Sequence, residues 1–330
     1  MGMRPLRLPH DFAALADMLV ETFQYPENPE WSVQADEQED LAQEIRGMQR
    51  VWPLVRLLQL VHRPLRDVLR GFVWDEEGRP VAAVLVQRMG SSSTWSVGTV
   101  GVLPAFRRQG LARRLLEHTL EFLRGRGAER VVLGVIDGNV PAYSLYRSLG
   151  FTHYGGQPEY YRAAAVPEAV PPLPAGYADE RLPRSDWRTR FELERRIVPA
   201  SHQQYEPVVI ERYRRPLPLF VLSSVALSLT GRRRVDRALR KQADGEIVGR
   251  YTYQLSKRGK GVARFSTALD PAHAVLAPYV VGTALREVAA ASPGIRVELL
   301  APGWMDGLAE AVERFGFRQR LEYHELGLIL

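Results

Sequence analysis

The amino-acid sequence predicts a mixed α/β (α+β) protein made of two similar domains in tandem. Three observations support this fold class. A proline-rich stretch divides the chain near its middle, the segments on either side of it match each other at a nearly constant offset, and strand patterns alternate with helix patterns. At 330 residues the chain is long enough for two domains, each with its own core.

The expected linker covers residues 164–176. Four prolines fall between Pro167 and Pro174, and such density favours an extended spacer over a packed element. We therefore expect a first domain at 1–163 and a second at 177–330.

The repeat rests on three landmarks. The strand–turn–strand segment 72–87 aligns with 239–254, so that the turn residues Gly78 and Gly245 lie 167 positions apart. Leu103-Pro104 matches Asp270-Pro271 at the same offset, and Leu149-Gly150-Phe151 matches Phe315-Gly316-Phe317 at 166. The nearly constant offset indicates duplication of one domain.

The first copy has a readable pattern of elements. Leucines on one face predict a helix over 109–126. A nearly continuous apolar run over 130–136 predicts a strand that is buried on both faces. Gly150 marks a helix end. We expect helices at 10–25, 37–61, 109–126 and 142–149, and strands at 69–75, 80–88, 94–102 and 130–136.

The composition excludes several classes of protein. The chain has no cysteine, which removes disulfides and thiolate metal sites, and its histidines lack metal-ligand spacing, so we expect no metal. No apolar run at 1–9 suggests a signal peptide, and the longest apolar stretch, 217–229, contains serines and is too short to span a bilayer. We expect a cytoplasmic protein without membrane association.

A strand running directly into a helix forms the first chemical motif, Val100 to Ala112. The start of a helix offers unpaired N–H groups and partial positive charge, and Gly110 lets an anion approach the backbone. Arg107 and Arg108 add charged donors. The motif suits a pyrophosphate but is neither a Walker loop nor a Rossmann fingerprint; by itself it also fits an ordinary strand–helix junction.

The second motif, Asn139 to Phe151, begins 29 residues after Gly110. Together the pieces V-x-P, R-x-x-G-x-A and N-x-x-A-x-x-L-Y-x-x-x-G-F resemble the GNAT superfamily of N-acetyltransferases, over roughly residues 4–162. The resemblance implies two tandem GNAT-like domains, each a mixed, mostly antiparallel sheet flanked by helices, with a splayed parallel strand pair. It also implies acetyl-CoA as co-substrate, held by Val100, Gly101, Val102, Arg107, Arg108, Gln109, Gly110, Leu111, Ala112, Arg113 and Asn139.

By the same resemblance Tyr146 is the general acid. A tyrosine with an ordinary pKa of about 10 stays protonated at neutral pH and can give its proton to a departing thiolate. The alternative is that Tyr146 only fills the core, and Tyr143 is a weaker candidate. The strands lack the carboxylate that many relatives carry, so we assign no general base; Asp137 and Glu21 are possible substitutes.

The second copy lacks these parts. Ala274 to Tyr279 replaces the glycine- and arginine-bearing motif, and Ala311-Val312 replaces Leu145-Tyr146. We expect a degenerate domain and one acetyl-CoA per chain. In mycothiol synthase, a tandem relative, the C-terminal copy is the active one, so that activity is not carried over.

Charge is unevenly distributed. Residues 1–165 are neutral overall, and the second half supplies the net charge of +6. Segment 27–44 holds seven acids, and 212–264 holds 14 basic residues against three acids. Both segments suit solvated faces, and the acidic one also suits a cationic acceptor.

Two hypotheses of function remain. The first is an N-acetyltransferase acting on a primary amine, in a small molecule or a peptide, by direct attack in a ternary complex. The second is an acyl-CoA-sensing module whose basic C-terminal domain engages a polyanionic partner. We expect no nucleic-acid partner, and a monomer or homodimer.

Overall fold

The computed structural model describes residues 2–32, 66–214, 232–256 and 261–330, with scattered positions at 34, 38, 49, 52–57, 59, 60 and 221. Most of the helix expected over 37–61 and most of the apolar stretch 217–229 lie outside the described residues. The same holds for the acidic residues Asp36, Glu37, Glu39, Asp40 and Glu44.

Apart from the helix expected over 37–61, the first half contains the expected elements within a few residues of the predicted bounds. Helix α3 buries Leu115, Leu116 and Leu123 on one face, and β5 is covered as its apolar sequence predicts. In chain order the elements are β1 (Gly2–Pro5), α1 (Phe12–Thr22), the 3-10 helix η1 (Pro29–Trp31), β2 (Arg70–Glu76), β3 (Arg79–Arg88), β4 (Thr94–Val102), the 3-10 helix η3 (Pro104–Phe106), α3 (Leu111–Gly125), β5 (Arg130–Ile136), α4 (Val140–Ser148) and β6 (Thr152–Ala163).

The second half repeats this order. Helix α9 begins 166 residues after α3, α10 begins 166 after α4, and β12 begins 166 after β6. The elements are β7 (Tyr177–Arg181), α5 (Trp187–Ile197), α6 (Ala200–Gln203), α7 (Ile210–Tyr213), β8 (Arg232–Lys241), β9 (Ile247–Ser256), β10 (Val262–Leu269), the 3-10 helix η4 (Pro271–Leu276), α9 (Ala277–Ala291), β11 (Arg296–Leu300), α10 (Asp306–Arg314) and β12 (Arg318–Ile329). The expected linker contains neither helix nor strand.

Both halves have the splayed strand pair. Strands β4 and β5 run parallel from Thr94↔Arg130 to Val97↔Leu133, and both continue after their pairing ends. Strands β10 and β11 pair in parallel only as far as Phe265↔Leu299. The predicted fold class, two tandem domains with mixed sheets and a splayed pair in each, is confirmed.

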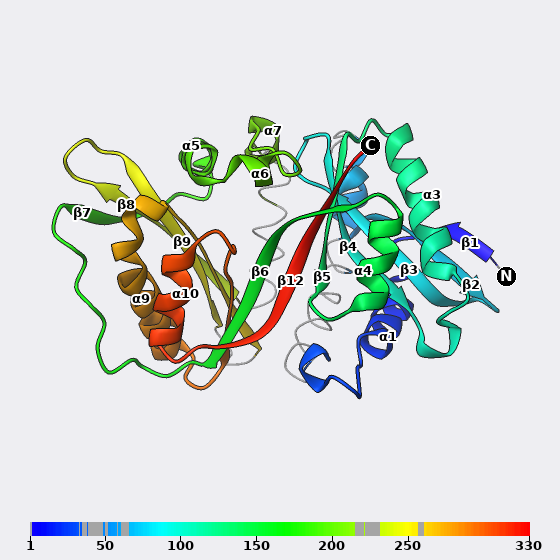
Figure 1. The fold of residues 1–330 in the computed structure, drawn as a ribbon, viewed down its shortest axis with the longest axis horizontal. Coiled ribbons are helices and arrows are strands. Elements are labelled where there is room, and N and C mark those ends of the chain that lie inside the picture. The colour runs from blue at the N-terminus through cyan, green and yellow to red at the C-terminus, as the bar shows by residue number, and fades with distance from the viewer. Residues whose placement is uncertain are drawn as a thin grey trace.

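The two sheets are joined by an exchange of their last strands. Strand β12, from the end of the chain, lies between β5 and β6 and is antiparallel to both, while β6 pairs with β11 of the second half. A single sheet of 12 described strands results, in the order β1-β2-β3-β4-β5-β12-β6-β11-β10-β9-β8-β7. Figure 1 shows β6 and β12 side by side at the centre, with the C-terminus against the first half.

The exchange also connects the two cores. Leu326 of β12 is fully buried in the core of the first half, among residues of α3, β3 and β5. Tyr160 of β6 is buried in the core of the second half. Full burial of a leucine side chain contributes about 1.5–3 kcal/mol, so each half depends on the other's last strand for part of its stability.

Helix α9 and the 3-10 helix η4 before it form one apolar segment. The segment Pro271–Ala291 is long and apolar enough to cross a membrane, with a mean hydropathy of 1.3 over its best window. However, 56% of that window is buried, and Val280, Leu285 and Val288 lie in the core of the second half. Core helices of folded domains meet the same criterion of length and composition.

Candidate active site

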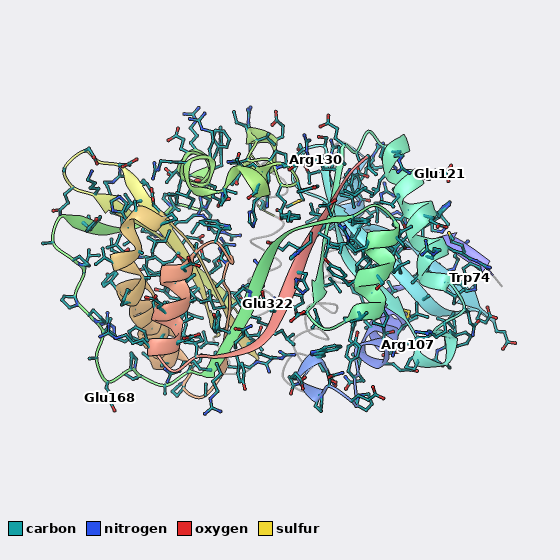
Figure 2. All side chains as sticks on the ribbon, viewed as in Figure 1. Trp74, Arg107, Glu121, Arg130, Glu168 and Glu322 are labelled. Carbon is teal, nitrogen blue, oxygen red and sulfur yellow. The ribbon has the colours of Figure 1, made fainter. Side chains whose placement is uncertain are left out.

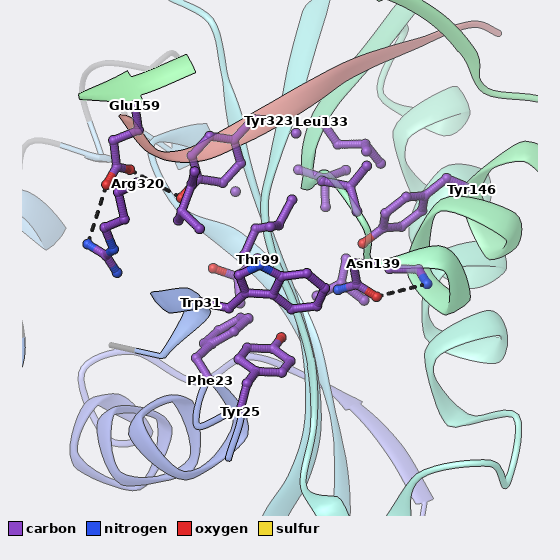
Figure 3. Close-up of a pocket in the computed structure, with 18 of the residues that line it drawn as sticks. Phe23, Tyr25, Trp31, Thr99, Leu133, Asn139, Tyr146, Glu159, Arg320 and Tyr323 are labelled. Atoms are coloured by element: carbon purple, nitrogen blue, oxygen red, sulfur yellow. Dashed lines mark hydrogen bonds and ion pairs between the residues drawn. The ribbon is translucent and has the colours of Figure 1, made fainter. Parts of the chain in front are cut away.

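A cavity of about 400 Å³ opens where β4 and β5 separate (Figure 3). The first half contributes aromatic side chains from the end of α1 and from η1, backbone and side chains of the two splayed strands, and α4. Strands β12, β6, β11 and β10, which follow β5 in the sheet, supply the rest of the wall. The lining residues are Phe23, Tyr25, Trp31, Val97, Gly98, Thr99, Val100, Leu133, Gly134, Val135, Ile136, Asn139, Ala142, Tyr146, Glu159, Arg264, Glu298, Arg320, Leu321 and Tyr323.

Tyr146 reaches this cavity from α4, and its hydroxyl points inward in Figure 3. Its residue is only 6% exposed, and its ring also contacts Phe151 edge-on in the core. Burial raises the pKa of Tyr146 above its ordinary value, and the nearby Tyr25 raises it further. The phenol therefore keeps its proton over the physiological pH range and is placed as a donor toward the cavity.

Helix α4 is fixed at both ends by residues of the sequence motif. The side chain of Asn139 accepts a hydrogen bond from the N–H of Ala142 at 3.3 Å and so caps the helix. Gly150 has φ +92°, the left-handed conformation typical of the residue after a helix. The amide of Phe151 then donates to the carbonyl of Tyr146 at 3.1 Å, which anchors the turn that carries the tyrosine.

The expected anion cradle lies at the start of α3. The first backbone bond of the helix runs from the N–H of Arg114 to the carbonyl of Gly110, so the amides before it are not needed by the helix. Gly110 has φ +76°, and a Cβ there would meet nothing within 4 Å. Arg108 also adopts a positive φ, of 65°. Open space, left-handed backbone and spare amides are the features that a pyrophosphate requires.

The arginines of the cradle differ in what they contact. Arg107 lies beside α1 (Figure 2): its guanidinium donates to the carbonyls of Thr22 and Val102 and lies over the ring of Tyr25. Its side chain therefore ties α1 to β4. Arg113 donates to the hydroxyl of Ser148 at 2.7 Å, which connects α3 to α4.

The remaining candidates divide between the cavity and the core. Val100 lines the cavity, whereas Gly101 faces α1, where a Cβ would come within 3.1 Å of Thr22. Val102 packs against the first core, and the side chain of Leu111 is buried there, so only its amide is available. Gln109 is exposed and Ala112 is half-buried beside the cradle.

Neither carboxylate considered as a base from the sequence lines the cavity. Asp137 is largely exposed and pairs with Nε2 of His324 at 2.7 Å, which lowers the pKa of its carboxyl. Glu21 is exposed and pairs with Arg79. Over the described ranges, no group of three or more His, Asp and Glu side chains has an arrangement that would hold a metal ion.

Two carboxylates that the sequence did not single out do line the cavity. Glu159 comes from β6 and Glu298 from β11. Arg320 of β12 donates to Oε1 of Glu159 at 3.3 Å, and the hydroxyl of Tyr323 donates to the other oxygen at 3.4 Å. Both glutamates reach the cavity through strand pairings that cross between the halves, which local sequence patterns do not reveal.

The corresponding region of the second half is filled with side chains. Leu276 and Ala277 at the start of α9 are fully buried, and Pro278 has no N–H to offer. The hydroxyl of Tyr279 donates to Asp179 at 2.8 Å. Val312, which lies 166 residues after Tyr146, is fully buried.

Comparison with known proteins agrees with these observations. The model of the acetyltransferase (GNAT) family matches residues 14–151. N-alpha-acetyltransferase RimI of Mycobacterium tuberculosis is 43% identical over 72 residues, which cover 22% of this chain and 44% of that protein. The [ribosomal protein bS18]-alanine N-acetyltransferase of Escherichia coli is 34% identical over 90 residues, 27% of this chain and 60% of that protein. The matches thus span less than two thirds of either relative.

Among solved structures, a tandem GNAT protein from the clavulanic acid biosynthesis pathway has the same fold over nearly the whole length. The similarity covers 99% of this chain and 98% of that one, with a TM-score of 0.66 and 16% sequence identity. The fold is therefore that of a tandem GNAT protein, and residues 14–151 of the chain are similar to the GNAT acetyltransferase family.

Proposed function

We propose that this protein is an acetyl-CoA-dependent N-acetyltransferase whose active site is the cavity between β4 and β5 in the first half. The observation that carries the proposal is the convergence of Tyr146, the splayed strands and the acid-bearing strands β6 and β11 on that one cavity. The curated relatives are named as N-acetyltransferases, which supports the same class of reaction.

The residues present fit coenzyme A. The left-handed backbone at Arg108 and Gly110 and the spare amides of α3 suit the pyrophosphate, and Arg108 and Arg113 supply positive charge nearby. Between Gly98 and Val102, β4 pairs with β3 on one side, while its pairing with β5 has ended on the other. When bound, acetyl-CoA supplies an activated thioester to this gap.

Tyr146 is assigned the role of general acid. Its raised pKa ensures that the proton is present when the thiolate departs, although the same shift makes the proton harder to give up. The phenol is buried on α4 and held by the cap at Asn139, so it needs no rearrangement to face the cavity.

Glu159 is assigned the role of binding the amine of the acceptor. It lies within the cavity wall with a residue exposure of 8%, and its carboxylate, although paired with Arg320, can still accept a hydrogen bond from the amine of the acceptor. Arg320 and Tyr323 hold it in place. The described lining also contains Glu298, Arg264 and Arg320, so the charges of the wall balance and suit a polar amine that carries further polar groups.

A kinetic screen tests the proposal. Acetyl-CoA would be offered with polyamines, aminoglycosides, free amino acids and a peptide that begins with alanine, as the name of the Escherichia coli relative suggests, and released thiol would be measured. We expect turnover with at least one amine. Acetyl-CoA binding without turnover by any of these acceptors would favour the sensing module instead.

A further inference from the structure

A second cavity, of about 720 Å³, shares no lining residue with the first. The β3–β4 hairpin of the first half forms one wall, and α5, the α7 segment, β8 and β9 of the second half form the others. Ser96 of β4 lines this cavity and Val97 lines the first one, so the two cavities contact opposite faces of that strand. Seven arginines surround it: Arg88, Arg184, Arg190, Arg212, Arg214, Arg234 and Arg250.

The carboxylates that pair with these arginines are fewer. Asp236 accepts from Arg190 at 3.2 Å and from Arg234 at 2.8 Å. Glu194 pairs with Arg250, and Glu206 pairs with Arg212 at 2.7 Å.

Among the described residues that line the cavity, seven are arginines and one, Glu194, carries a carboxylate. The wall retains an excess of positive charge, of which the basic segment 212–264 supplies four arginines.

Some arginines of this wall lie close enough to lower one another's pKa. Burial lowers the pKa of Arg184, and the charge of Arg234 lowers it further. Burial also lowers the pKa of Arg190; Asp236 opposes this shift, and Arg250 and Arg234 add to it. Guanidinium groups that weaken one another's protonation gain most from a multivalent anion placed between them.

We propose that this cavity binds a small polyanion of the di- or polyphosphate class. Its volume suits a metabolite-sized ligand, and guanidinium groups bind phosphate oxygens in pairs. Trp187 and Tyr213 supply flat apolar surface beside the arginines, which suits an organic group attached to the phosphates. Because the walls come from both halves, the ligand stabilises their contact.

Titration calorimetry on the full chain tests this site. The probe is inorganic pyrophosphate, added in the presence of saturating coenzyme A so that the expected cradle at α3 is already filled. We expect one pyrophosphate per chain, and weakening by about tenfold or more in Arg184→Gln and in Arg214→Gln, the usual effect of losing a charge-assisted hydrogen bond. Inorganic sulfate, with a single anionic centre, should bind more weakly than pyrophosphate.

Arg233→Gln is the matched control. Arg233 precedes Arg234 on β8, is exposed and does not line the cavity, so the variant removes the same net charge from the chain. It should change pyrophosphate affinity by less than about twofold. Each variant's melting temperature without ligand shows whether it folds, and pyrophosphate should raise the melting temperature of the wild type and of Arg233→Gln more than that of Arg184→Gln. Lack of binding by the wild type, or equal weakening in Arg233→Gln, would overturn the proposal.

Discussion

Arg320 on β12 donates a hydrogen bond to Glu159 on β6 across the exchanged strands, at 3.3 Å. The register of β12 shifts between Gln319 and Leu321, so Arg320 is the extra residue of a β-bulge and has no direct partner in the ladder. A bulge redirects a side chain, and here the guanidinium also donates to the carbonyls of Glu30 and Ser32 beside η1. Arg320 thus connects both exchanged strands with η1, whose Trp31 lines the cavity.

Glu159→Gln should weaken binding of the acceptor. The amide keeps the shape of the carboxylate but loses its charge, so we expect the KM for an amine to rise about tenfold or more, with unchanged affinity for acetyl-CoA. The wild-type kcat/KM should fall as salt is added if the acceptor is cationic. Asp137→Asn is the control, because that carboxylate is exposed and outside the cavity. Equal kinetics in both variants would remove Glu159 from the acceptor site.

Tyr146→Phe should lower kcat by about 10²-fold or more, the usual scale for the loss of a general acid. Affinity for acetyl-CoA should barely change, and the ring should still fill its place against Phe151. Because its pKa is raised, ionisation of Tyr146 should cause no loss of activity up to about pH 10. Single-turnover measurements with a good acceptor check both expectations, and a rate equal to wild type would reduce Tyr146 to a packing residue.

Gly110→Trp should abolish binding of acetyl-CoA, which we expect to occur once per chain. Gly127→Trp is a matched control at the other end of α3, since both glycines have positive φ and open space around the missing Cβ. Backbone strain is thus similar in the two variants, and only Gly110→Trp obstructs the cradle. Calorimetry should give a stoichiometry near one for wild type and Gly127→Trp. A stoichiometry of two would mean that the second half also binds acetyl-CoA.

Leu326→Ala should destabilise the first half although the residue lies four positions from the end of the sequence. Its side chain is fully buried in that core, and such substitutions cost about 2–5 kcal/mol. Ile329→Ala, on the same strand but 53% exposed, should cost less than about 1 kcal/mol. Urea unfolding monitored by tryptophan fluorescence measures both. Similar losses in the two variants would be inconsistent with the exchange of β12 into the first sheet.

Most of the elements and the catalytic candidates could be predicted from the amino-acid sequence because they are encoded by neighbouring residues, and the duplication could be predicted from matching segments. Leucine spacing specified α3, an apolar run specified β5, and Asn139 and Gly150 specified the ends of α4. The constant offset between the halves reappears as equal spacing of their helices.

The pairing partners of the two last strands, β6 and β12, could not be predicted from the sequence. Segments 152–163 and 318–329 are strands at equivalent positions of the two copies, so local propensity cannot choose between pairing within a half and pairing across halves. That choice brings Glu159 and Arg320 into one cavity and assembles arginines from two halves around another. Both sites depend on long-range strand pairing, which has no signature in neighbouring residues.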